Sequence, residues 1–518
     1  MSSAPPTTDP VSARTATPSK EILLTRILTC GFFAVIAFTL IVPFFSSLSW
    51  TTLVQDDFFY YLVVAQNVVH GHGSTFNGIV ATNGYQPLWV ACIVALSFFT
   101  TNARVILGFV ALTSFAASGA TFALSNKLFR STGVRPLLAF VFSAWLVATS
   151  LALFCMGMEV TLAIPLVVAV GCALSDFGRI TRSPLHAFYL GLLLAAMVLA
   201  RIDTIILTAI LCIGVLASKP LRTSINFRTI TAVVCGFLPA VLYFISNRVY
   251  FHTWLPISGM AKQLKLDHHL SSLPFQAFRE QISGSVKLSV LFIALSIILL
   301  PKLFPRLSSI QRVTLISLLI YPFIYYPTLS FLSDWPLWAW YWYAIRLAFL
   351  ASLALFCLSP LTRYWLQKPI VLALLILAVF LQVSTHPWKR DDFDIDDTAI
   401  RTRDFAATHP GIYAMGDRAG TVAYLLPYPV VQLEGLMMDR HFLDLLRVQV
   451  PLRQVMAEYH VRYYIATAFD DQPCFVAVEP RLGGPHVAHM RDQFCEPPAL
   501  RFTSFGKTTL IYDLGPQH

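Results

Sequence analysis

Eleven long apolar runs, separated by short polar connections, occupy most of the chain before residue 386. A helix needs about 20 apolar residues to cross a hydrocarbon core about 30 Å thick. The runs predict eleven membrane-crossing helices, at 23–48, 104–125, 135–154, 160–177, 184–200, 204–218, 229–248, 286–304, 311–331, 338–358 and 368–385. This pattern indicates an all-α polytopic membrane protein.

The segment between the first two runs, residues 49–103, has a different pattern. From Asp57 to His70, apolar and polar residues alternate at roughly helical spacing, which predicts a helix along the membrane surface. The apolar stretch from Leu88 to Phe99 is too short to cross the bilayer. We therefore expect both helices to remain on one side of the membrane, in a long first outer loop.

Composition supports a membrane protein. Of the 518 residues, 56% are hydrophobic and 12% are charged, whereas soluble domains carry about 25% charged residues. The net charge of +10 could indicate nucleic-acid binding, but the basic residues are dispersed among loops between apolar runs. Membrane orientation explains that distribution better.

The basic residues also predict the orientation. They cluster in alternate connections: Lys127, Arg130 and Arg135; Arg179 and Arg182; Lys219, Arg222 and Arg228; Lys302, Arg306 and Arg312; and Arg363 and Lys368. The intervening connections are nearly free of Lys and Arg. Because cytoplasmic loops carry the excess of basic residues, the N-terminus is expected in the cytoplasm. With eleven crossings, the chain after residue 385 then lies outside it.

Three regions follow from these patterns. Residues 1–22 are rich in Ser, Thr, Pro and Ala and are expected to form a disordered cytoplasmic tail, and residues 23–385 form the transmembrane domain. Residues 386–518 are polar and predict a small extracytoplasmic α/β domain. Its expected strands are 412–415, 430–433 and 461–467, and its expected helices are 418–426 and 441–459. Cys474 and Cys495 could pair there in an oxidising compartment, but the sequence does not decide it.

Under this topology the unusual polar residues gather on the outer face. They are Asp56 and Asp57 after the first run, Glu159, Arg201 and Asp203 in outer turns, Lys262 in a later outer loop, and Asp334 and Trp335 at the start of a Trp-rich loop. Each has a structural alternative. Asp57 could cap a helix, Glu159 could favour a helix dipole, Arg201 and Asp203 could form a self-satisfying ion pair, and the Trp residues could form an interfacial belt.

Together these residue types supply what glycosyl transfer from a lipid phosphate needs. A carboxylate can accept the proton of an attacking hydroxyl, and our hypothesis from the sequence is Asp56 as the general base, helped by Asp57 and Glu159, although the sequence does not decide between the two aspartates. Cationic groups such as Arg201 or Lys262 can stabilise the departing phosphate. Aromatic side chains can stack on sugar rings.

The ordered motifs resemble one superfamily. Asp56-Asp57 through Gly71-His-Gly73 to Thr82-Asn-Gly-Tyr85-Gln-Pro-Leu-Trp89 is similar to the first outer loop of GT-C membrane glycosyltransferases. The likeness is narrower to bacterial Rhizobium-core-transferase and protein O-mannosyltransferase-like proteins. Gly157-Met-Glu159, Ala200-Arg-Ile-Asp203, Pro256-Ile-Ser-Gly259 with Lys262, and residues 335–343 follow in the same order. Gly416-Asp417 and Leu433-Glu-Gly-Leu436 are similar to an attached outer domain.

The resemblance implies a polyprenyl-phosphate-sugar donor, transfer on the outer face of a bacterial cytoplasmic membrane, and inversion at the anomeric carbon. It implies a base at Asp56 or Asp57 with a second acidic residue at Glu159, and substrate contacts at Tyr85 and Trp89 as well as at Arg201, Asp203, Lys262, Asp334 and Trp335. The family position that is often His holds Gln86 here. The sequence leaves open whether a divalent metal takes part, and which sugar and glycan, lipid or protein acceptor are used.

Other classes of protein remain as alternatives. A polyprenyl-lipid transporter or flippase would place charges near the membrane midplane and repeat internally, and the sequence shows no convincing repeat. A non-catalytic envelope assembly protein would use the C-terminal domain for docking. A phosphatase or polymer ligase acting on polyprenyl carriers is a nearer alternative.

Overall fold

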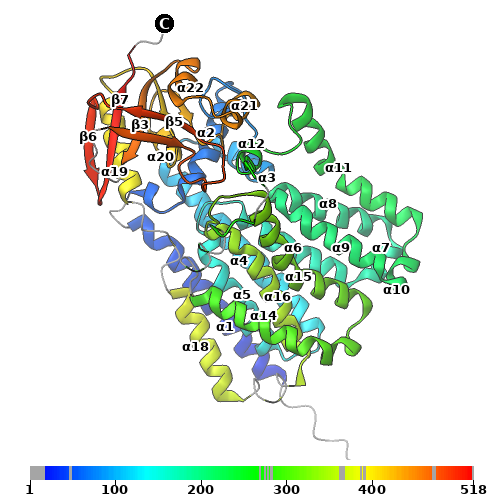
Figure 1. Ribbon diagram of the computed structural model, residues 1–518. Helices are drawn as coiled ribbons and strands as arrows, with labels where there is room; N and C mark the ends of the chain where they lie inside the picture. The colour runs from blue at the N-terminus through cyan, green and yellow to red at the C-terminus, as the bar shows by residue number, and fades with distance from the viewer. Residues whose placement is uncertain are drawn as a thin grey trace, which may run out of the picture.

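A computed structural model describes residues 18–45, 49–267, 270–273, 276, 279, 284–360, 364, 368–384, 388, 393–468 and 474–515. Most of the predicted tail at residues 1–22 lies outside these ranges, and helix α1 begins at Pro18. Figure 1 shows a helical bundle with a mixed α/β domain at one end.

The helices of the bundle follow the predicted apolar runs. They are α1 (Pro18–Ile41), η1 (Val42–Phe45), α4 (Ala103–Ser131), α5 (Pro136–Phe154), α6 (Val160–Ser175), α7 (Phe177–Arg182), α8 (Pro184–Ala200), η3 (Ile202–Thr204), α9 (Ile205–Ala217), α10 (Lys219–Ser224), α11 (Phe227–Tyr250), α14 (Gly284–Leu303), η4 (Phe304–Arg306), α15 (Ser309–Leu332), η5 (Ala339–Trp342), α16 (Tyr343–Leu358) and α18 (Pro369–Ser384).

Within the described residues, seven helices are long and apolar enough to cross a membrane. They span Lys20–Phe45, Ala103–Ser131, Pro136–Phe154, Phe227–Tyr250, Val286–Arg306, Ser309–Leu332 and Ala339–Leu358. Four further predicted crossings correspond to shorter apolar helices, at Val160–Ser175, Pro184–Ala200, Ile202–Ala217 and Pro369–Ser384. The count of eleven crossings therefore stays a prediction.

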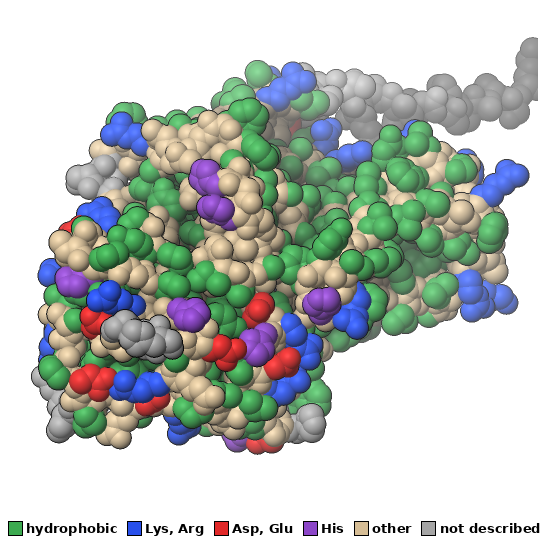
Figure 2. All heavy atoms as spheres, turned by 90° about the horizontal axis from the view of Figure 1, so that it is seen from above, with side chains coloured by type: hydrophobic (Ala, Val, Ile, Leu, Met, Phe, Trp, Pro, Cys, Tyr) green, Lys and Arg blue, Asp and Glu red, His purple; other side chains and the backbone are tan. Residues whose placement is uncertain are grey.

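Side chains on the bundle surface fit an apolar surrounding. Helix α11 exposes Val234, Leu238, Leu242 and Ile245. In Figure 2, seen from above, acidic, basic and His side chains gather over one part of the molecule, while hydrophobic side chains cover much of the rest. A contiguous exposed apolar face of this kind is expected where lipid covers it.

The closest helix pairing is between α8 and α11. A Cβ atom on Gly191 would lie 2.1 Å from the carbonyl oxygen of Val233, and one on Gly236 would lie 2.1 Å from that of Phe188. The two glycines thus let the backbones touch, as small residues do in membrane helix pairs. This contact holds α11 beside α8, which carries Arg201 at its C-terminal end.

Two helices predicted in the first outer loop are present, α2 (Asp56–Val69) and α3 (Pro87–Ser97), preceded by η2 (Trp50–Thr52). Eight residues of α2 are buried. Phe58, Phe59 and Leu62 join the core of the bundle, whereas Tyr60 and Val64 join the core of the C-terminal domain. The position of α2 along the membrane surface stays a prediction, and its burial by a second domain was not predicted from the alternating pattern.

The C-terminal domain is built on a five-stranded sheet of order β2-β1-β3-β7-β6. Its strands are β1 (Ile412–Met415), β2 (Val430–Gln432), β3 (Val461–Ala468), β6 (Leu500–Ser504) and β7 (Lys507–Asp513), and a separate hairpin joins β4 (Phe475–Glu479) to β5 (Met490–Phe494). Strand β1 pairs in parallel with β2 and β3, and β7 pairs antiparallel with β3 and β6. The helices are α19 (Phe393–Ala406), α20 (Ala419–Leu425), α21 (Arg440–Arg447) and α22 (Leu452–Glu458).

The predicted helix 441–459 is wrong as a single element. It is divided into α21 and α22, because Gln449 adopts a positive φ of 57° and Pro451 precedes α22. Proline is favoured only at the start of a helix, so it separates the two. The three predicted strands are confirmed, and Cys474 and Cys495 form a disulfide.

The outer loop after α11 ties the domain to the bundle. After the short helix α12 (Ile257–Ala261), the amide of Leu266 donates to the carbonyl of His486 at 2.7 Å, and the amide of Ala488 donates to that of Leu264 at 2.9 Å. Figure 1 shows α2, α3 and α12 at this junction.

At the other end, contacts group the basic connections. Arg135 forms an ion pair with Glu21 at 2.8 Å, and Asn226 donates to the carbonyl of Thr181 at 3.4 Å. The start of α1 thus lies beside one basic connection, and two further basic connections lie beside each other, as the predicted orientation requires.

The orientation predicts opposite accessibility for the two ends of α4. Thr101→Cys, just before α4, should react with a membrane-impermeant maleimide on intact spheroplasts, because it lies in the predicted first outer loop. Ser131→Cys, at the end of α4, should react only after the membrane is permeabilised. Both positions are exposed, and the parent protein supplies the baseline. Labelling of both from the same side would contradict a crossing by α4.

Candidate active site

The two adjacent acidic residues at the start of α2 have different surroundings. Successive residues on a helix point about 100° apart, so Asp56 and Asp57 face different neighbours. The carboxylate of Asp56 accepts hydrogen bonds from the amide of Gly420 at 3.1 Å, the amide of Thr421 at 2.7 Å and the hydroxyl of Thr421 at 2.6 Å. It therefore caps the N-terminus of α20, whose own N-cap residue, Arg418, makes no side-chain cap.

Asp57 instead faces open space. In the part of the chain that the structure describes, no hydrogen bond or ion pair engages its carboxylate. It lines two cavities together with Tyr60, Lys262, Trp340 and Leu436. Burial raises the pKa of Asp57 to about 7; Lys262 opposes this shift, while Asp56 and Glu159 add to it.

The first cavity, of about 60 Å³, opens toward the helical bundle. We call it the inner cavity. Besides the shared residues it is lined by Tyr61, Gln86, Glu159, Arg201 and Tyr341. Its lining brings together Glu159, Arg201 and Lys262, which the sequence predicted to lie on one face of the membrane.

Arg201 is fully engaged at the wall of the inner cavity. It donates to Glu159 at 2.5 Å and forms paired hydrogen bonds with Asp203 at 2.9 to 3.0 Å. Tyr61 donates to the other oxygen of Glu159 at 3.0 Å. Tyr325 and Tyr343 donate to Asp203 at 2.5 and 2.9 Å. This buried network satisfies its charges internally, so it shapes the cavity and is poorly placed to move toward a ligand.

Gln86 has a positioning contact. Its side-chain oxygen accepts from the amide of Ile202 at 2.9 Å. Gln86, at the position where the similar family often has His, thus holds the turn that carries Arg201 and Asp203.

The second cavity, of about 170 Å³, opens toward the C-terminal domain. We call it the outer cavity. Besides the shared residues it is lined by Asp56, Trp335, Trp338, Asp417 and Glu434, among others. Glu434 and Trp335 are each 3% exposed, and Oε1 of Glu434 and Nε1 of Trp335 form no hydrogen bond with any residue that the structure describes. A buried polar atom without a partner is costly, and it is suited to meet a polar ligand.

Lys262 is the cation at the boundary of the two cavities. Its Nζ donates to the hydroxyl of Tyr341 at 3.1 Å and lies 5.8 Å from the ring centre of Trp335. Burial works against its charge, but Tyr341 and Asp57 outweigh burial and raise the pKa of Lys262. It therefore stays protonated opposite Asp57.

The other predicted substrate residues lie elsewhere. Trp89 is fully buried and donates to the carbonyl of Gly157 at 2.8 Å, and Tyr85 contacts Ser74 at 2.6 Å. Asp334 accepts from Ser271 and, at 3.2 Å, from the amide of His486, so it holds a loop of the C-terminal domain. These three residues line neither the inner nor the outer cavity.

Several residues that line the site had no catalytic role predicted from the sequence. Glu434 and Asp417 stood only in motifs similar to an attached domain, and Tyr61 and Tyr341 were unremarked members of longer motifs. Their common signal is a polar atom within an apolar segment. Among the described residues, no group of three or more His, Cys, Asp or Glu side chains could hold a metal ion.

Comparisons with known proteins give a distant likeness. No protein-family model matches the chain, and no curated protein matches it. Among solved structures, it is similar to the Archaeoglobus fulgidus oligosaccharyltransferase tethered to an acceptor peptide, with 12% sequence identity and a TM-score of 0.48. The match covers 84% of this chain and 68% of the other. A likeness at this level carries no argument about function.

The two acidic residues of α2 should differ in their effect on stability. Asp56→Ala removes three hydrogen bonds to α20 and is expected to lower the free energy of unfolding by about 1–3 kcal/mol. Thr421→Val should produce part of that loss. Thermal unfolding of the detergent-solubilised protein measures both. Asp404→Ala, on the exposed side of α19, is the matched control. Equal stability of Asp56→Ala and the control would contradict the capping role.

Proposed function

We propose that the protein is a membrane glycosyltransferase that transfers a sugar from a polyprenyl-phosphate donor to an acceptor of the cell envelope, with Asp57 as the general base. The observation that carries the proposal is the position of Asp57. Its carboxylate has no hydrogen bond or ion pair with the described part of the chain, and it lines two cavities together with a buried lysine, Lys262. The motifs similar to GT-C glycosyltransferases support the same reaction.

The chemistry assigns each cavity a substrate. The donor phosphate would occupy the inner cavity beside Lys262, and the acceptor hydroxyl would enter from the outer cavity. Asp57 takes the proton of the hydroxyl as its oxygen attacks the anomeric carbon. The bond from that carbon to the phosphate oxygen breaks, and the phosphate leaves with its electron pair and its negative charge near Lys262. A single displacement of this kind inverts the anomeric carbon.

Asp57 is favoured over Asp56 as the base because of hydrogen bonding. Burial raises the pKa of Asp56 as well, but Asp56 already accepts three hydrogen bonds, which oppose that shift and occupy its oxygens. Asp57 has no such partner, and a pKa near the working pH suits proton transfer. Glu159 is a positioning residue, because its carboxylate holds Arg201 at the wall of the inner cavity.

Asp57→Asn should abolish transfer. Loss of a general base typically lowers the rate by about 10²–10⁴-fold, and the substitution keeps the shape of the side chain. The assay is glycan and lipid profiling of a deletion strain complemented with each variant. Asp404→Asn is the matched control and should restore the wild-type profile. A wild-type profile from Asp57→Asn would refute the proposal, and so would a wild type indistinguishable from the deletion strain.

The pH dependence of transfer should report the same residue. The pKa of Asp57 is raised to about 7, and only the deprotonated form is a base. The rate should therefore rise about tenfold per pH unit below 7 and level off above it. Lys262, Asp56, Glu159 and Asp417 are the charged groups that act on Asp57. Lys262→Met, which removes the opposing positive charge, should move this limb to higher pH in membranes supplied with donor lipid. A flat profile between pH 5 and 8 would exclude Asp57 as the base.

A further inference from the structure

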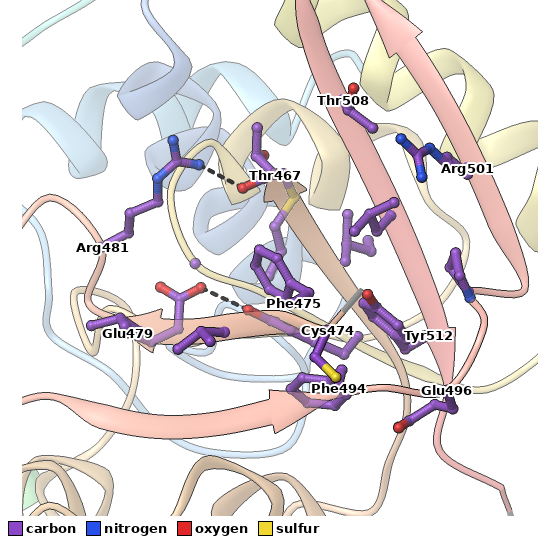
Figure 3. A pocket seen from close by; sticks show the side chains of 18 of the residues that line it. Thr467, Cys474, Phe475, Glu479, Arg481, Phe494, Glu496, Arg501, Thr508 and Tyr512 are labelled. Carbon is purple, nitrogen blue, oxygen red and sulfur yellow. Dashed lines mark hydrogen bonds between the residues drawn. The ribbon is translucent and has the colours of Figure 1, made fainter. Parts of the chain in front are cut away.

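A third cavity lies inside the C-terminal domain. It has a volume of about 600 Å³ and lies between the five-stranded sheet and the β4–β5 hairpin. Figure 3 shows side chains from both sheets around it, with the Cys474–Cys495 disulfide at one edge. Small-molecule sites in proteins occupy about 300–1,000 Å³, so the cavity has the size of a ligand site.

One wall of this cavity is aromatic. Phe494 lies 5.2 Å from Tyr464 and 4.9 Å from Tyr512 between ring centres, and Phe475 lies 6.2 Å from Tyr512. The planes of these pairs differ by 22° to 34°, so the rings pack against one another as an aromatic cluster. Such a cluster gives this wall an apolar character that suits the C–H groups of a ligand.

The adjacent wall is polar and centres on Glu479. This side chain is 5% exposed; one of its oxygens accepts from the hydroxyl of Tyr464 at 3.2 Å, while none of the described residues forms a hydrogen bond with Oε2. A Cβ on Gly416 would lie 2.1 Å from Oε2, so only glycine leaves room for this carboxylate. In Figure 3 Glu479 lies beside Arg481, whose guanidinium donates to the carbonyl of Thr467 at 3.0 Å.

These walls select among ligand classes. An acyl chain would leave the buried oxygen of Glu479 unpaired, which is costly. A phosphate would lie against Glu479, Asp417 and Glu496, which also line the cavity. A saccharide satisfies both walls, because its C–H face packs on aromatic rings while its hydroxyls donate to carboxylates and accept from arginines.

The cavity also adjoins the candidate active site. Asp417 lines both this cavity and the outer cavity, which contains Asp57. The two cavities therefore share Asp417 as part of their walls.

We propose that this cavity binds a saccharide portion of the acceptor and directs its hydroxyl toward Asp57. The assignment of the saccharide as acceptor rests on the proposed function, whereas binding of a saccharide by the cavity does not. The acceptor class is then a glycan or a glycan-bearing molecule, and its sugar specificity resides in the C-terminal domain.

Binding can be measured without transfer. The full-length protein in nanodiscs is applied to an array of defined oligosaccharides of neutral, amino and acidic sugars, and the dissociation constant of the strongest one is determined by calorimetry. Glu479→Gln should weaken binding about tenfold or more, as expected for loss of a charged hydrogen bond. Phe475→Leu should also weaken it, without touching the contact between Glu479 and Tyr464. Glu458→Gln, on the surface of the same domain, is the matched control and should bind as the wild type does.

The outcomes separate this inference from the proposed function. Asp57→Asn should lose transfer yet bind the same oligosaccharide with unchanged affinity. If no oligosaccharide binds, or if Glu479→Gln and Phe475→Leu both bind like the control, the inference is wrong even where Asp57 proves essential. Binding of tetramethylammonium or inorganic phosphate, but of no saccharide, would also overturn the inference. If binding behaves as expected but Asp57→Asn transfers normally, the proposed function fails and the saccharide site remains.

Discussion

Burial of α2 on both faces is the constraint on which the rest of the structure depends. Phe58, Phe59 and Leu62 pack into the bundle, and Tyr60 and Val64 pack into the C-terminal domain. The buried stretch of α2 from Phe58 to Ala65 is apolar on every side and must be covered on every side. The carboxylates at its start are consequently held at the junction of two cores, where water is scarce and their protonation depends on their immediate neighbours.

At this junction two chemically identical residues, Asp56 and Asp57, have different roles. Asp56 gives its hydrogen-bonding capacity to α20, so it fixes the C-terminal domain to the helix. Asp57, about 100° further round the helix, has only the field of Lys262 to oppose its burial. The Arg201 network fixes the shape of the inner cavity, as Asp56 fixes the position of the C-terminal domain. In both places a charged side chain holds its neighbours through hydrogen bonds.

The sequence predicted the positions of the bundle helices well, because an apolar run of about 20 residues has few alternatives. It also predicted that Glu159, Arg201 and Lys262 come together, since loop charges alone gave the sidedness. It could not separate Asp56 from Asp57, because the distinction depends on amides of Gly420 and Thr421 more than 360 residues away. The strands of residues 475–513 were also missed, as their alternation is weak and their pairing is non-local.

The shared position of Asp417 has a consequence for biogenesis. Except for Leu436 and Met437, the residues that line the inner cavity are synthesised before residue 350, whereas the outer cavity needs Asp417 and Glu434 from the last part of the chain. A nascent or truncated chain could therefore insert its first helices and still lack a place for the second substrate. Under the proposed function, transfer would begin only after the final domain has folded and packed on α2.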